Sequence, residues 1–223
     1  MTYLEYARRD ISSGTQQGAM NALGHANRAV HLVMDKLLKI YKLDAWAKAP
    51  FPVRAELLGD IGAFPTRIVS RLNRARNFME HDYTFVEVDR AADFVELAEL
   101  FLTVAYPFFH NGTIGVYVGT KENPLCEEWF LEPQGKGVAV ADIKVESYLD
   151  LPTMRIPYNI QRPHEVKPRF IVPLTRGSQA EWMPYLDLLV YCTRRRALRL
   201  PQPDSRGPGV YLLRHSLEFG MAE

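Results

Sequence analysis

The chain has 223 residues, a formal net charge of +1 at pH 7, and 24% charged residues. This length suffices for one large domain or two small ones, and the near-zero net charge excludes a general electrostatic attraction of the whole chain for nucleic acid. Its two cysteines, Cys126 and Cys192, lie far apart, which argues against a zinc knuckle and a disulfide framework.

The N-terminal segment carries charged residues where a signal peptide needs an apolar core, and no run of 18 apolar residues occurs. Together with the sparse cysteines, this predicts a soluble cytoplasmic protein with no membrane partner.

Prolines divide the chain into two parts. Only Pro50, Pro52 and Pro65 of the 15 prolines precede residue 107. Because proline disrupts helix interiors and favours turns, this predicts a helical first half and a second half of strands and turns. We therefore expect a helical domain at residues 1–110 and a smaller, strand-rich α+β domain at residues 111–223.

The first half shows apolar residues at spacings of three and four, which are typical of amphipathic helices. A long helix is predicted at 15–43, a short one at 53–60, a third from Pro65 onward and a last one at 87–106. Short links between four helices predict an antiparallel four-helix bundle.

The second half shows alternating apolar residues and turn sequences, which are typical of strands. Strands are predicted at residues 113–120, 137–146 with a bulge, 169–174 and 209–219. A helix is predicted at 182–199, and Ser178 with Glu181 matches a capping box before it. The fold class expected for the whole chain is α+β.

Residues 76–83, Arg-Asn-Phe-Met-Glu-His-Asp-Tyr, combine side chains that suit phosphodiester cleavage. Histidine can both accept and donate protons near neutral pH, and arginine has a fork of donors that matches phosphate oxygens. RNA brings its own nucleophile, the 2′-hydroxyl, so Arg76 and His81 could support cleavage without a metal or any other cofactor.

The spacing of Arg76 and His81 places them about 140° apart around a straight helix, whereas Asn77 and His81 share a face. Convergence of Arg76 with His81 therefore needs a helix end or kink near Glu80, or a second copy of the motif. A twofold dimer would bring two arginines and two histidines into one cleft.

The Arg-x4-His pattern on the third helix of a short bundle resembles the signature of the HEPN superfamily, and the resemblance covers residues 10–109. It implies a HEPN-like bundle that forms a homodimer through the motif face and acts as a metal-independent endoribonuclease. By this resemblance, Arg76 binds phosphate, Asn77 is the adjacent polar residue, His81 is catalytic and Tyr83 supports the site.

The resemblance also implies a setting in a toxin–antitoxin or anti-phage (antiviral defence) system, with an antitoxin or regulatory protein as a further partner. Arg67, Arg71 and Arg74 precede the motif and would attract the RNA backbone. Residues 111–223 could recognise RNA, sense a ligand or hold an inhibitor.

Two alternatives remain open at this level. One is a non-catalytic HEPN-like module that binds a partner protein or a nucleotide-like ligand. The other is a solvated arginine face whose charges pair with acids of the next helix. Those acids are Glu87, Asp89, Asp93, Glu96 and Glu99.

Overall fold

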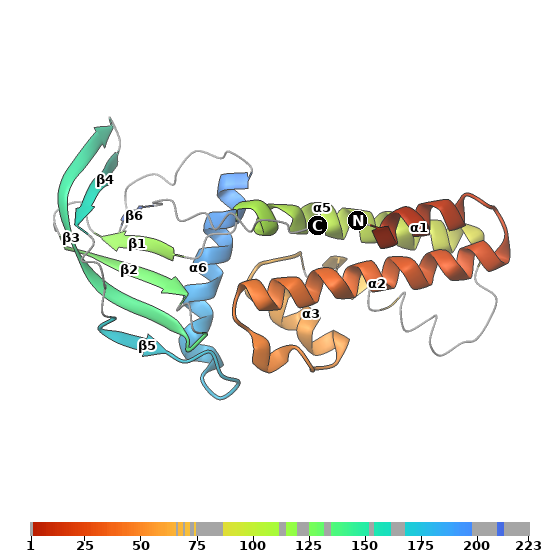
Figure 1. The fold of residues 1–223 in the computed structure, drawn as a ribbon, viewed down its shortest axis with the longest axis horizontal. Coiled ribbons are helices and arrows are strands. Elements are labelled where there is room, and N and C mark those ends of the chain that lie inside the picture. The colour runs from red at the N-terminus through yellow and green to blue at the C-terminus, as the bar shows by residue number, and fades with distance from the viewer. Residues whose placement is uncertain are drawn as a thin grey trace. The chain divides into compact units, whose positions relative to one another are not determined.

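The structure is a computed structural model. It describes residues 2–65, 67–68, 70–71, 74, 87–111, 115–119, 125–131, 135–151, 154–161, 168–197 and 209–211. The chain forms two compact units, one of Met1–Ile40 with Trp46–Tyr106 and one of Tyr41–Ala45 with Pro107–Glu223 (Figure 1). The predicted domain boundary at residue 110 stays a prediction.

In the first half of the chain, the structure confirms three of the predicted helices and contains one helix that was not predicted. The bounds are α1 (Thr2–Ile11), α2 (Gln16–Ile40), the 3-10 turn η1 (Asp44–Trp46), α3 (Phe51–Asp60) and α5 (Val88–Asn111). Helix α1 was not predicted. Helix α5 continues past the predicted end at residue 106 and through Pro107, although proline cannot donate the usual helical hydrogen bond there.

The core of the first unit lies along the apolar face of α2. Its buried positions recur at intervals of three and four, as an amphipathic helix requires. Phe64 and Phe101 stack on each other with ring centroids 4.1 Å apart, and both are almost completely buried. Packing of the helices against one another thus encloses the core of this unit.

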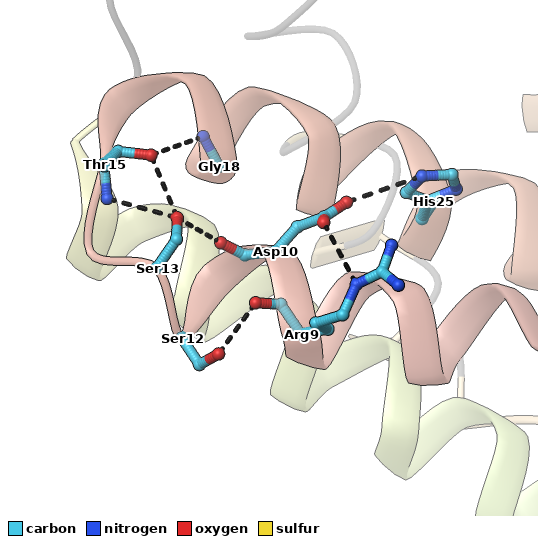
Figure 2. A network of polar contacts seen from close by, with 7 residues as sticks. All are labelled: Arg9, Asp10, Ser12, Ser13, Thr15, Gly18 and His25. Carbon is cyan, nitrogen blue, oxygen red and sulfur yellow. Dashed lines mark hydrogen bonds and ion pairs between the residues drawn. The ribbon is translucent and has the colours of Figure 1, made fainter.

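The turn between α1 and α2 is held by side-chain hydroxyls (Figure 2). Thr15 caps α2, because its Oγ1 accepts a 3.0 Å hydrogen bond from the backbone N–H of Gly18. The Ser13 hydroxyl donates to the carbonyl of Asp10 at 2.7 Å. A Cβ on Gly18 would lie 2.0 Å from Ser13 Oγ and 2.3 Å from the Asp10 carbonyl oxygen, so the close approach requires glycine.

The second unit contains an antiparallel sheet. Its strands are β1 (Gly115–Gly119), β2 (Leu125–Leu131), β3 (Val138–Leu151), β4 (Met154–Gln161), β5 (Phe170–Val172) and β6 (Gly209–Tyr211). The strand order is β4-β3-β2-β1-β6, and β5 pairs with the start of β3. The structure confirms β1, β3, β5 and the start of the predicted last strand, while β2 and β4 were not predicted.

The bulge expected after Val140 is absent from the β2–β3 ladder, whose register is unbroken from Val138 to Lys144, and β3 shifts register later, where it pairs with β4. The register shifts between Val145 and Ser147 and again before Tyr148. Such a shift lets a long strand bend while keeping most of its ladder.

Helix α6 (Gln179–Ala197) confirms the predicted helix near residue 182. Trp182, Leu186 and Leu189 are buried, as the spacing indicated. The Trp182 indole N–H donates to the carbonyl of Thr175 at 2.8 Å, which fixes the start of the helix. The Ser178 hydroxyl donates to the Pro173 carbonyl at 2.6 Å instead of forming the predicted capping box.

The chain is therefore an α+β protein, with packed helices early in the sequence and an antiparallel sheet with a helix later. Within the ranges that the structure describes, no helix is long and apolar enough to cross a membrane.

Candidate functional site

The predicted catalytic residues Arg76, Asn77, His81 and Tyr83 all lie outside the described residues. Their convergence across a twofold axis stays a prediction.

The three arginines that precede the motif are described, and each is helical and exposed. The N–H of Ile68 donates to the Pro65 carbonyl at 2.9 Å, so a turn begins at the proline as the sequence predicted. Ile68 is half-buried, whereas Arg67, Arg71 and Arg74 are exposed. These three arginines have the spacing i, i+4, i+7. In an α-helix such positions fall within about 60° of one another. We call these three residues the arginine face.

One alternative from the sequence is that the arginine face pairs with acids of the next helix. Two of those acids have other partners, since Arg8 donates to Glu99 and Arg90 pairs with Glu87 at 3.2 Å. The remaining three, Asp89, Asp93 and Glu96, are exposed. Among the described residues, no ion pair joins the arginine face to any of these acids.

The sequence analysis did not single out a buried arginine in α3. Arg54 is only 7% exposed, and it donates through Nη1 to the carboxylate of Asp35 in α2. Its Nη2 lies 3.0 Å from Nδ1 of His31, whose ring packs against Phe51 at a centroid distance of 5.0 Å. The cluster ties α3 to α2. Its sequence signal was weak, because α3 also carries Glu56 and Asp60, and no local pattern sets Arg54 apart from these exposed charges.

His25, in the N-terminal half of α2, makes a separate set of contacts. Its Nε2 lies 3.5 Å from Asp10 Oδ2, and Arg9 approaches the same carboxylate at 3.8 Å (Figure 2). The rings of Tyr3 and Tyr6 lie 6.1 Å and 5.5 Å from the His25 ring. These contacts join α1 to α2.

His25 and His31 thus have separate partners, Asp10 for His25 and Arg54 for His31. In the part of the chain that is described, no group of three or more histidine, cysteine or acidic side chains could hold a metal ion.

Comparison of the chain with protein-family models, with curated proteins and with solved structures gives no match.

Proposed function

We propose that the protein is a metal-independent endoribonuclease with a HEPN-like helical bundle, active as a homodimer. Arg76 binds the scissile phosphate, and His81 acts as the acid–base residue. Asn77 orients His81, and Tyr83 donates a hydrogen bond to substrate or to the facing motif.

The observation that carries this proposal is the arginine face. Arg67, Arg71 and Arg74 are exposed and have no acidic partner among the described residues, so their charges remain directed to solvent. Guanidinium groups bind phosphate oxygens with fork geometry, and a row of them attracts an RNA backbone. Arg74 precedes Arg76, the first residue of the proposed catalytic motif, by two positions in the sequence.

The proposed reaction needs no metal. The His81 imidazole of one copy accepts the proton of the 2′-hydroxyl, and the 2′-oxygen forms a bond to phosphorus. The bond from phosphorus to the 5′-oxygen breaks, and a protonated His81 of the other copy donates its proton to that oxygen. Arg76 stabilises the negative charge on the phosphate in the transition state. The products carry a 2′,3′-cyclic phosphate and a 5′-hydroxyl.

The proposed setting is a toxin–antitoxin or anti-phage system in which a second protein restrains the nuclease. The α+β domain at residues 111–223 would then recognise RNA, sense a ligand or hold the inhibitor.

A pair of RNA substrates tests the chemistry. One is an RNA with a single preferred cleavage position, and the other has a 2′-deoxynucleotide immediately 5′ of that position. In EDTA, the first should be cut to a cyclic phosphate and the second should survive, because it lacks the internal nucleophile. Equal cleavage of both substrates would refute the mechanism. A complete lack of EDTA-resistant cleavage would favour a non-catalytic HEPN-like binding module.

A further inference from the structure

The junction of α1 and α2 carries a group of aromatic and polar side chains at the surface of the first unit. Tyr3, Tyr6 and Asp10 have the spacing i, i+3, i+7, which places them within about 60° of one another around α1. The Asp10 side chain lies between those of Arg9 and His25 (Figure 2). We call Tyr3, Tyr6, Asp10 and His25 the junction cluster.

The carboxylate of Asp10 has few partners for a group that is only 17% exposed. Its Oδ2 lies 3.5 Å from Nε2 of His25, and its Oδ1 lies 3.8 Å from Nε of Arg9. Both distances are longer than that of an ordinary hydrogen bond. Among the described residues, the carboxylate therefore accepts no hydrogen bond of ordinary length. Because acceptors that are largely removed from water destabilise when they lack donors, this carboxylate is suited to a ligand that donates hydrogen bonds.

The tyrosine rings beside this carboxylate present flat apolar surface to solvent. Tyr3 and Tyr6 are each 39% exposed. The Tyr3 ring is stacked with the His25 ring, with an angle of 23° between the two planes. The planar guanidinium of Arg9 lies 5.2 Å from the centroid of the Tyr6 ring. Planar groups thus already pack on both tyrosines, and the exposed part of the rings can take another.

The charges at the junction cluster favour a neutral ligand. Arg9 and Asp10 are adjacent and carry opposite charges, so the attraction of either one for an ion is offset by repulsion from the other. What remains is a hydrogen-bond acceptor beside aromatic surface. A neutral, planar group with donors along one edge matches both features.

We propose that the junction cluster binds an unpaired guanine base of RNA. Guanine has two adjacent donors on its Watson–Crick edge, N1–H and the N2 amino group, and they match the two oxygens of the Asp10 carboxylate. Adenine and cytosine each have an amino donor beside an acceptor, and uracil has one donor between two acceptors. Unpaired bases of RNA are commonly stacked on aromatic side chains and recognised through this edge. The exposed guanidinium of Arg9 provides positive charge for the adjoining phosphate.

This inference rests on the proposed function in one respect, because it takes RNA as the source of the base. The junction cluster lies outside the proposed catalytic motif at residues 76–83. Its role is to select the RNA, and the motif cuts it.

Fluorescence anisotropy of the full chain tests the base preference with RNA that cannot be cleaved. The probes are labelled 2′-O-methyl oligouridylates in which the central base is guanine, hypoxanthine, adenine or uracil. The guanine probe should bind about 5-fold or more tightly than the other three, since hypoxanthine lacks only the N2 amino group and still loses one of the two hydrogen bonds.

Three variants locate the preference. Asp10→Asn should abolish it, because an amide can accept at only one of its two positions. Tyr6→Leu should weaken binding of the guanine probe about 5-fold or more, because stacking on the ring is lost. Glu5→Gln is the matched control, since Glu5 is an exposed acid of α1 outside the junction cluster, and it should bind all probes as the wild type does. Circular dichroism establishes that every variant is folded.

Equal affinity for the guanine and hypoxanthine probes, or a preference that survives in Asp10→Asn, would overturn the guanine site. Guanosine monophosphate that displaces the guanine probe at the same concentration as unlabelled oligonucleotide would assign the junction cluster to a free nucleotide instead of RNA. An arginine-rich peptide that binds through Asp10, while the oligonucleotides show no base preference, would assign it to a protein partner.

The guanine site and the nuclease fail separately in these experiments. His81→Ala should lose cleavage and keep the guanine preference. A wild type that prefers guanine through Asp10 but cuts no RNA would refute only the nuclease, and a wild type that cuts RNA without this preference would refute only the guanine site.

Discussion

The guanidinium of Arg54 lies 3.0 Å from Nδ1 of His31, and it also donates to the carboxylate of Asp35. Since the guanidinium can only donate, Nδ1 of His31 is the acceptor and Nε2 carries the ring proton. The exposed fraction of the Arg54 side chain is 9%, against 53% for Asp35. The pair is therefore asymmetric, with a buried cation and a partly solvated anion.

This asymmetry predicts how the pair responds to substitution. Asp35→Ala leaves a buried guanidinium without its counter-charge, so the free energy of unfolding should fall by about 2 kcal/mol or more. The double variant R54M/D35A removes that charge while keeping a side chain of similar length. It should be more stable than Asp35→Ala alone in urea unfolding.

The control for this pair is Asp60→Ala, because Asp60 is an exposed acid at the end of α3. It should leave stability within about 0.5 kcal/mol of the wild type. If R54M/D35A were less stable than Asp35→Ala, the explanation above would be contradicted. The remaining contacts of the Arg54 guanidinium would then stabilise the fold by more than the burial of its charge destabilises it.

Two glycines of α2 should respond in opposite ways to alanine. Gly18→Ala would place a Cβ 2.3 Å from the Asp10 carbonyl oxygen, which is backbone and cannot rotate away. A loss of about 2 kcal/mol or more is expected, as for other overpacked sites. Gly24 is exposed and has no atom within 4 Å of its ideal Cβ, so Gly24→Ala should stabilise the helix by about 0.5–1 kcal/mol. Thermal unfolding compares the two, and equal effects would contradict the tight α1–α2 turn.

A second glycine pair tests the β3–β5 ladder. A Cβ on Gly137 would lie 2.1 Å from the carbonyl oxygen of Val172, so Gly137→Ala must push β5 away from β3. The Arg169 N–H, which donates to the Val140 carbonyl at 2.7 Å, should then exchange with solvent faster. Gly177→Ala is the control, because its Cβ would have no neighbour within 4 Å. Unchanged exchange at Arg169 in Gly137→Ala would contradict this strand pairing.

The phenol of Tyr41 predicts a loss of stability at alkaline pH. Tyr41 is fully buried, and this burial raises the pKa of its phenol strongly. The Thr193 side chain lies nearby and opposes the shift, but the two hydroxyls do not meet the geometry of a hydrogen bond. The folded state therefore keeps a proton that the unfolded state releases near pH 10. Stability is retained below that pH and falls above it by about 1.4 kcal/mol per pH unit.

Tyr41→Phe isolates this contribution, because both proteins share every other titrating group. Near neutral pH the two should differ little, since the lost hydroxyl has no hydrogen-bond partner among the described residues. Above about pH 10 the variant should lose stability less steeply than the wild type. Parallel curves in that range would show that Tyr41 ionises freely in the folded protein.

Helix periodicity gave reliable predictions where a helix was long and amphipathic. Helix α2 begins and ends within a few residues of its prediction because its buried positions follow a regular 3.6-residue period. Helix α5 extends past its predicted end at residue 106 and through Pro107, a residue whose local preference is to break a helix. Tertiary packing around the buried Phe108 outweighs that local preference.

The elements that were missed lack a local period. Strand β2, with the sequence Leu-Cys-Glu-Glu-Trp-Phe-Leu, does not alternate between polar and apolar residues, and its place depends on pairing with β1 and β3. The Arg54 cluster likewise depends on residues 19 or more positions apart, which no local pattern connects. The candidate site was predicted only from a short motif, and its described part is the arginine face.

RNA cleavage in EDTA by single-residue variants tests the central claim most directly. Arg76→Ala and His81→Ala should each abolish release of 2′,3′-cyclic phosphate products, while Arg28→Ala, at an exposed arginine of α2, should cleave as the wild type does. Cleavage that persists undiminished in His81→Ala would contradict the nuclease site proposed for residues 76–83.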